Sequence, residues 1–229
     1  MLRTSMRMAA GALAAGAVLT ACGPVRMGAA AVMTSQRISS ATLAAQVANL
    51  NTGYLRYKGK ITLQYPVSQM PQEALSWLVR FRVRDQLAAA DGIRVSPGQT
   101  QAALAQITAQ ARSSAGAGVP LAELAVANGL PPDLLTALGQ YQAIETAVVS
   151  RLDGGTLPKS TTAQQALAAR FSQAECRAAK SLDITINPQF GRLDYTELSV
   201  IAAPSTLSAT GGPTPAATPS ASPQLTPDC

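Results

Sequence analysis

The 229-residue chain contains no histidine. Catalytic triads and dyads that use histidine, zinc sites of the metalloprotease type and histidine-based acid–base catalysis are therefore excluded. The sequence also lacks a glycine-rich phosphate loop and a Cys-x-x-Cys pair. The carboxylates of the helical region occur singly, where we expect helix caps and solvated helix flanks; they are Glu73, Asp85, Asp91, Glu123, Asp133, Glu145 and Glu175. We therefore predict a protein that is not an enzyme and that uses no metal or cofactor.

Charge is sparse as well. Charged residues make up 13% of the chain, and 18 basic residues against 12 acidic ones give a net charge of +6. Arg80, Arg82 and Arg84 form an alternating cluster in a predicted helix, which we interpret as a solvated flank. A small, scattered positive charge argues against nucleic acid as a partner and modestly favours an anionic membrane surface.

The N-terminal residues have the pattern of a secretory signal. Arg3 and Arg7 precede an apolar run over residues 8–19, which is too short to span a membrane, and the run ends in "LTAC". That tetrapeptide resembles the bacterial lipobox, so we predict a signal peptide over residues 1–21 and a lipidated Cys22. The alternative is an ordinary signal peptide in which Cys22 is incidental.

Lipidation would give the protein a stable anchor. Two acyl chains, such as palmitate, hold a protein stably on a bilayer, whereas one chain alone binds only marginally. We therefore expect the protein on the extracytoplasmic face of the cell membrane, with the lipid bilayer as a partner through acylated Cys22. Residues 22–28 form a short linker, which keeps the following domain close to the membrane.

The two other cysteines are Cys176 and Cys229. Cys176 lies about half a turn away from the apolar stripe of the last predicted helix, so we expect it to face solvent. Cys229 ends the chain, and a flexible tail over residues 204–229, rich in Pro, Thr, Ser and Ala, would let the two thiols meet. A disulfide and two unpaired thiols both remain open. The tail itself fits either a spacer or a glycosylated stalk.

Residues 29–203 have the pattern of one mostly helical domain. Ser39 is a predicted N-cap of a helix that ends near Gly53, and residues 54–68 are expected to be extended. The longest helix, from Pro71 to Gly92, is apolar on most faces and should be central. Ser96 and Gln99 form a capping-box pattern that opens the next helix.

Three further helices complete the pattern. A short helix follows Pro120, another follows Pro131-Pro132, and Thr162 with Gln165 suggests a capping box for the last one, which runs to about Lys180.

A strand-like segment follows the last helix. Leu182, Ile184 and Ile186 alternate with polar residues, as in a half-buried strand. The backbone groups of such a strand need a partner, and the apolar run at residues 29–33 is the plausible one. The predicted fold is therefore a multi-helix bundle clipped by a small two-stranded sheet, which pairs the N- and C-terminal ends of the domain.

Four segments in this order resemble the N-terminal domain of the SurA and PrsA group of extracytoplasmic foldases: "AAAVMTSQRISSATL", "DGIRVSPGQT", "ANGLPPDLL" and "ITINPQFGRLD". The similarity is greatest to stand-alone actinobacterial lipoproteins. Fuller members of the group carry a parvulin domain before the last helix, where this chain has a gap of loop length at residues 153–161. The resemblance therefore implies a chaperone-like domain that binds unfolded exported polypeptides, without prolyl isomerase activity.

The residues that would contact such polypeptides are Trp77, Phe81 and Tyr141, although aromatic residues on a helix stripe are more often part of the core. A second hypothesis is a structural or adaptor lipoprotein that docks one specific membrane or cell-wall partner and has lost the chaperone activity.

Overall fold

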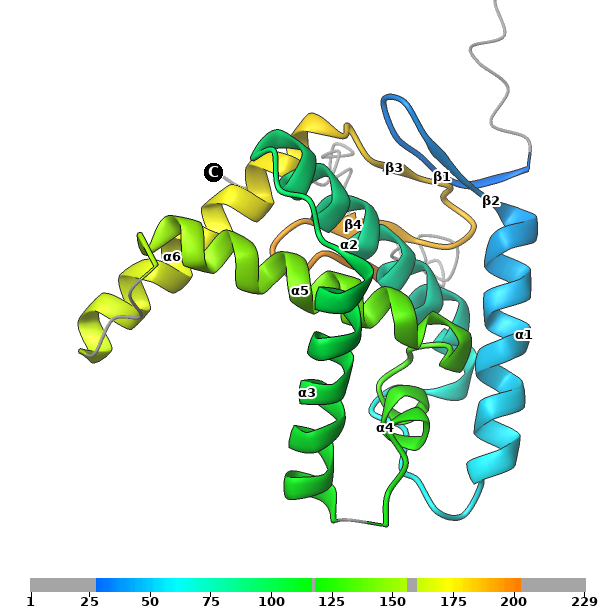
Figure 1. Cartoon of the computed structure of the whole chain (residues 1–229). Helices are drawn as coiled ribbons and strands as arrows, with labels where there is room; N and C mark the ends of the chain where they lie inside the picture. Colours follow the sequence, from blue (N-terminus) through cyan, green and yellow to red (C-terminus); the bar gives the residue numbers. More distant parts are fainter. Residues whose placement is uncertain (1–27, 117, 156–159, 203–229) are drawn as a thin grey trace, which may run out of the picture.

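The computed structural model describes residues 28–116, 118–155 and 160–202 (Figure 1). The protein is mostly helical, as predicted. The described helices are α1 (Ser40–Tyr57), α2 (Met70–Ala90), α3 (Pro97–Ala115), α4 (Leu121–Ala127), α5 (Leu135–Leu152) and α6 (Thr161–Ser181), with short 3-10 helices at Val67–Gln69 and Pro132–Leu134. The strands are β1 (Ala29–Val32), β2 (Arg37–Ser39), β3 (Thr185–Ile186), β4 (Arg192–Asp194) and β5 (Ser199–Ile201).

The two ends of the domain are joined by strand pairing, as predicted. β1 and β3 are antiparallel, with Ala31 opposite Ile186, and the Asn187 amide donates to the Ala30 carbonyl oxygen at 2.9 Å. The sheet has three strands instead of the predicted two, in the order β2-β1-β3. A tight turn at residues 33–36 lets β2, which was not predicted, fold back on β1.

A second sheet, which was not predicted, follows the "NPQFG" turn. β4 and β5 form an antiparallel hairpin, and the Val200 amide donates to the buried Ser76 hydroxyl of α2 at 2.7 Å. Gly191 has a φ of +126°, and a Cβ there would collide with the carbonyl oxygen of Ile201. Glycine is therefore required where the chain turns under the hairpin.

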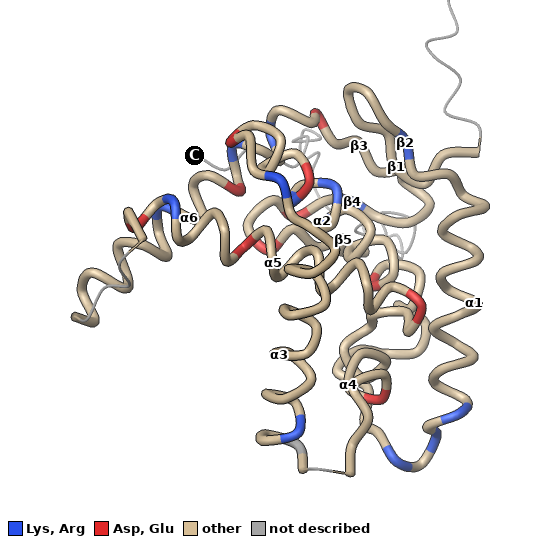
Figure 2. Tube along the Cα trace, in the orientation of Figure 1, with Lys and Arg blue, Asp and Glu red and all other residues tan. Residues whose placement is uncertain are grey.

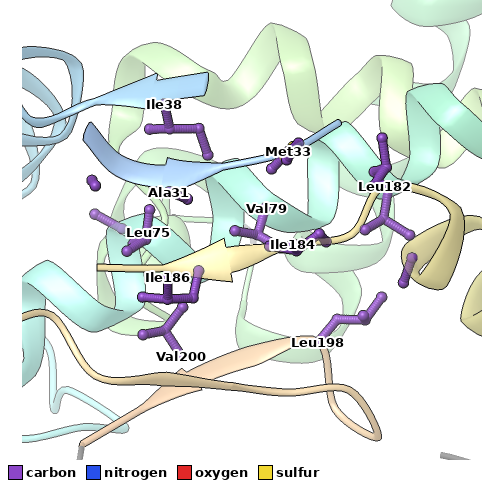
Figure 3. Packing of buried hydrophobic residues seen from close by; sticks show 14 of the residues in the cluster. Ala31, Met33, Ile38, Leu75, Val79, Leu182, Ile184, Ile186, Leu198 and Val200 are labelled. Carbon is purple, nitrogen blue, oxygen red and sulfur yellow. The ribbon is translucent and has the colours of Figure 1, made fainter. Parts of the chain in front are cut away.

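Helix α2 is central, as predicted. It contacts α1, α5, α6 and β5, and Leu75, Val79 and Val83 on one of its faces are fully buried. Figure 3 shows residues from α2 and from strands of both sheets gathered in one apolar cluster. Leu182, Ile184 and Ile186 are all buried in it, which confirms the alternation of that segment.

Helix α1 continues to Tyr57, so the predicted end near Gly53 and the extended segment from residue 54 are wrong over residues 54–57. Gly53 is buried within the helix, and a Cβ there would lie 2.7 Å from Cγ2 of Val126. This glycine allows α4 to approach α1 closely, whereas the sequence alone suggests a helix end.

The helix caps were mostly predicted. Ser39 accepts a hydrogen bond from the Thr42 amide, and Ser96 with Gln99 forms a capping box. The cap of α6 is Ser160, which accepts from the Ala163 amide, so the predicted capping box at Thr162 is wrong. Both residues are good N-caps by type, and the one that precedes the first helical residue is used.

We predict that Gly139→Ala destabilises the protein by about 1–3 kcal/mol, although alanine favours a helix over glycine. A Cβ at Gly139 of α5 would lie 2.8 Å from the Thr100 carbonyl oxygen of α3. The matched control is Gly98→Ala, because the nearest atom to its Cβ is the Ser96 hydroxyl at 3.9 Å. Urea unfolding measures both changes, and equal stability of the two variants would contradict the close contact of α3 with α5.

Stability should also fall at alkaline pH because of Tyr65. Its hydroxyl donates to the Val126 carbonyl oxygen at 3.1 Å, and burial, with a smaller effect of the Glu73 charge, raises the pKa of Tyr65 to about 12. The folded pKa lies above the ordinary value of 10.0, so this stabilisation is complete below about pH 10 and is lost toward pH 12. Urea unfolding should show a loss of up to about 3 kcal/mol over this range, and Tyr65→Phe should remove that part of the slope.

Candidate functional site

The three aromatic residues predicted to contact polypeptides lie together where α2 packs on α5. The ring centres of Trp77 and Phe81, one turn apart on α2, are 5.8 Å apart, and that of Tyr141 on α5 lies 6.4 Å and 5.9 Å from them. Tyr141 packs edge-on against both rings, the arrangement that aromatic pairs favour. All three side chains are half-buried. They form one aromatic cluster that is accessible to solvent.

The indole of Trp77 is held in place from two sides. Its Nε1 donates to the Asn128 carbonyl oxygen at 3.1 Å, and the Arg80 guanidinium lies 5.2 Å from the ring centre. Arg80 in turn donates to the Glu197 carbonyl oxygen in the turn between β4 and β5. Because these contacts fix the ring orientation, little rotamer freedom remains to be lost when another group binds there.

Beside the cluster lies Arg84, which is buried with a side-chain exposure of 2%. Its guanidinium forms ion pairs with Glu145 of α5 at 3.2 Å and Glu175 of α6 at 3.0 Å. It also lies 3.9 Å from the ring centre of Tyr141 and 4.7 Å from that of Phe171. The interpretation of Arg84 as a solvated flank is therefore wrong, and so is the expectation that Glu145 and Glu175 act singly.

The Glu175 carboxyl group beside this cation differs from a free one. Burial raises the pKa of Glu175 above its ordinary value, while Arg84 acts in the opposite direction. Burial likewise raises the pKa of Tyr141, so its hydroxyl stays protonated at neutral pH. The aromatic cluster thus borders a buried cation, one of whose partners, Glu175, is largely withdrawn from water.

One hollow adjoins the cluster, and a second hollow lies next to the first. The smaller, about 40 Å³, is bordered by Phe81, Arg84 and Tyr141 and has room for one water. Arg84 Nε has no hydrogen-bond partner among the described residues. The larger, about 420 Å³, lies along the C-terminal end of α2 and the interior of α5 and is lined by Ala88, Ala89, Gly92, Ile93, Arg94, Val95 and Ile144.

Asp85 and Gln140 border both hollows and join them. Gln140 Nε2 donates to the Asp85 carboxylate at 3.2 Å, and burial raises the pKa of Asp85. The aromatic cluster and the two hollows therefore form one continuous surface, which we call the α2–α5 seam. Its rings and its mixture of apolar and polar lining groups are the features of a binding surface for a partly apolar ligand.

The predicted cysteine sites are described only in part. Cys176 on α6 is half-buried, where we expected it to face solvent, and it is disulfide-bonded. Cys22 and Cys229 lie outside the described residues, so pairing with Cys229 and lipidation of Cys22 stay predictions. Within the described ranges, no group of three acidic or cysteine residues is arranged to hold a metal ion, and no helix is both long and apolar enough to cross a membrane.

No family model, no curated protein and no solved structure matches the chain.

We predict that Arg84→Met costs about 3 kcal/mol at pH 7, because it leaves the Glu145 and Glu175 charges without their partner. The cost should shrink toward pH 5. Without Arg84, the pKa of Glu175 rises further, and a carboxyl whose folded pKa is raised destabilises the fold as pH rises through that value. Urea unfolding at both pH values measures this change.

The matched control is Arg82→Met on the same helix. Arg82 is 47% exposed and lies 3.9 Å from Asp85, so its loss should cost less than about 0.5 kcal/mol. A difference between the two variants of under about 0.5 kcal/mol would contradict the role of Arg84 as a buried, paired cation.

Proposed function

We propose that this protein is a membrane-anchored extracytoplasmic lipoprotein whose helical domain binds unfolded, newly exported polypeptides without prolyl isomerase activity. The observation that carries the proposal is the α2–α5 seam, in which Asp85 and Gln140 join a fixed aromatic cluster to a 420 Å³ hollow. The resemblance to the SurA and PrsA group supports the same reading.

Binding at the seam would need no nucleotide and no covalent step. The large hollow has the volume to take one or more apolar side chains of an extended segment, and apolar surface removed from water contributes about 25 cal/mol per Å². The rings of Trp77, Phe81 and Tyr141 offer contact area that is already ordered. Such contacts are largely independent of client sequence, which suits a protein that binds many unfolded chains.

Polar groups at the rim suit the backbone of such a segment. Gln140 and Asp85 border both hollows, and the exposed Arg94 lines the larger one. Together they provide donors and acceptors for peptide groups, which would otherwise lose their hydrogen bonds to water on binding. The seam therefore combines apolar contact with the few polar groups that an extended polypeptide needs.

The absence of isomerase activity is supported by the connection between α5 and α6. α5 ends at Leu152 and α6 begins at Thr161. A connection of this length has no room for the parvulin domain that fuller members of the resembled group carry at this place.

The proposed anchor agrees with the start of the described chain. The Ser40 amide donates to the Gly28 carbonyl oxygen at 2.7 Å, so Gly28, which follows Cys22 by only six residues, lies beside the N-terminal end of α1. Clients would meet the domain close to the membrane through which they are exported.

The test uses Trp77, the single tryptophan of the chain, as the reporter. We expect its emission to shift and saturate when a reduced, unfolded client that lacks tryptophan is added to protein starting at Gly23. In parallel, a near-equimolar amount of the protein should suppress aggregation of several unrelated denatured clients, while a protease-coupled peptide assay should detect no catalysed prolyl isomerisation.

The matched variants are Phe81→Ala in the cluster and Phe190→Ala in the turn before β4, since both phenylalanines are half-buried. Phe81→Ala should weaken client binding several-fold, whereas Phe190→Ala should not, with circular dichroism as the check that both fold. An unchanged Trp77 emission and no suppression with any client would favour the adaptor hypothesis, and a pull-down from membranes would then seek the one partner.

A further inference from the structure

A second surface, remote from the α2–α5 seam, carries positive charge together with exposed apolar side chains. Arg56, Lys58 and Lys60 follow one another at the C-terminal end of α1, and all three are exposed. Arg112 lies in the last turn of α3. In Figure 2 the Lys and Arg segments at the ends of α1 and α3 appear at the same lower end of the molecule. We call Arg56, Lys58, Lys60 and Arg112 the basic tip.

The tip has little acidic compensation. Glu73 is the first acidic residue of the whole chain, so nothing on β1, β2, α1 or the loop up to α2 offsets the basic side chains. α4, which contacts both α1 and α3, contributes one acidic residue, Glu123. The tip therefore keeps a net positive charge.

A hydrogen-bonded turn and two side chains that pack on the core hold the backbone of the tip in place. The Lys60 amide donates to the Tyr57 carbonyl oxygen at 2.9 Å, which closes a turn around Gly59, whose φ is +84°. Tyr57 and Ile61 pack against the core, so the lysines between them are directed to solvent. The backbone that carries these charges therefore needs little ordering when they meet a surface.

An exposed apolar side chain adjoins the charges. Leu55 on α1, one residue before Arg56, is 58% exposed, and Val67, in the 3-10 helix before α2, is 49% exposed. They are the large hydrophobic residues that the described part of the chain leaves exposed. Basic residues next to exposed apolar ones are the combination by which a protein surface binds anionic bilayers, since the cations contact headgroups while the apolar groups enter the interface.

We propose that the basic tip, with Leu55, binds the surface of a membrane that contains anionic phospholipids. The binding requires no acyl chain. Where Cys22 is lipidated, which rests on the proposed function, the tip becomes a second contact that sets the orientation of the domain.

The geometry of α1 suits this second contact. Gly28 lies at the N-terminal end of α1 and the tip at its other end, about 27 Å away for 18 helical residues. The exposed residues between the two ends are uncharged and mostly small; they are Ala41, Thr42, Ala44, Ala45, Ala48, Asn51 and Thr52. α1 can therefore lie along an anionic surface without electrostatic repulsion.

The test is co-sedimentation with vesicles of phosphatidylcholine alone and of phosphatidylcholine with one part in three of phosphatidylglycerol. The protein starts at Gly23, without an acyl chain, and so keeps all the contacts described for residues 28–202. We expect binding to the anionic vesicles only. Because each Lys or Arg near such a surface is worth about 1 kcal/mol, or roughly fivefold, Arg56→Gln with Lys58→Gln and Lys60→Gln should lower the partition coefficient on the order of 100-fold.

The matched control removes the same number of charges elsewhere, by Arg94→Gln, Arg177→Gln and Arg192→Gln, all at exposed residues. It should retain most of the binding. An equal loss in both triple variants would assign the effect to net charge and overturn the proposal, as would no binding of the unaltered protein. Circular dichroism confirms that both variants fold.

Two further measurements test whether the tip binds a membrane and not any polyanion, and whether this binding is independent of the α2–α5 seam. Leu55→Gln should weaken vesicle binding several-fold. A long inorganic polyphosphate should bind the protein more weakly than anionic vesicles do at equal charge. Tighter binding of polyphosphate than of vesicles, together with no effect of Leu55→Gln, would overturn the assignment of a membrane as the partner. Phe81→Ala should leave vesicle binding unchanged. Loss of client binding with intact vesicle binding, or the opposite, distinguishes failure of the proposed function from failure of this inference.

Discussion

The burial of the Arg84 guanidinium constrains how the helices of this protein assemble. A cation withdrawn from water is stable only if its partners compensate for the lost hydration, and here the partners come from two other helices, Glu145 on α5 and Glu175 on α6. Tyr141 and Phe171 cover the guanidinium from the same two helices. A shift of α5 or α6 along α2 would leave a buried charge unpaired. The ion cluster therefore favours one register of three helices, whereas apolar contacts alone tolerate several.

The strand pairing at the other side of α2 supplies the second constraint. β1 comes from the start of the domain and β3 from beyond α6, and both pack against the apolar face of α2. The β4–β5 hairpin is tied to the same helix through the Ser76 hydroxyl. α2 is thus held on one face by the sheets and α1 and on the other by the ion cluster. α2 can therefore carry a buried arginine, because carboxylates from α5 and α6 pair with its guanidinium.

Local signals in the sequence were sufficient for part of this fold. Ser39 and Ser96 are recognisable caps, and the alternation at Leu182, Ile184 and Ile186 identifies a strand that needs a partner. Gly53 and Arg84 were misread because their roles depend on contacts with residues distant in the chain. A signal for Arg84 was present: it follows Trp77 and Phe81 at helical spacing, so it shares their face of α2. The hollows of the seam arise from packing between helices, which no local pattern encodes.

The two faces of α2 also determine where the α2–α5 seam lies relative to α1, which carries the basic tip. Leu75, Val79 and Val83 point into the core shared with Leu43 and Leu50 of α1, whereas Trp77 and Phe81 lie toward α5. Residues 75 and 77 differ by two positions, which places their side chains roughly 160° apart around the helix. α1 and the aromatic cluster therefore lie on opposite sides of α2. If α1 rests along the bilayer, the seam faces away from it, so that a polypeptide leaving the membrane can reach the rings while the basic tip stays in contact with lipid.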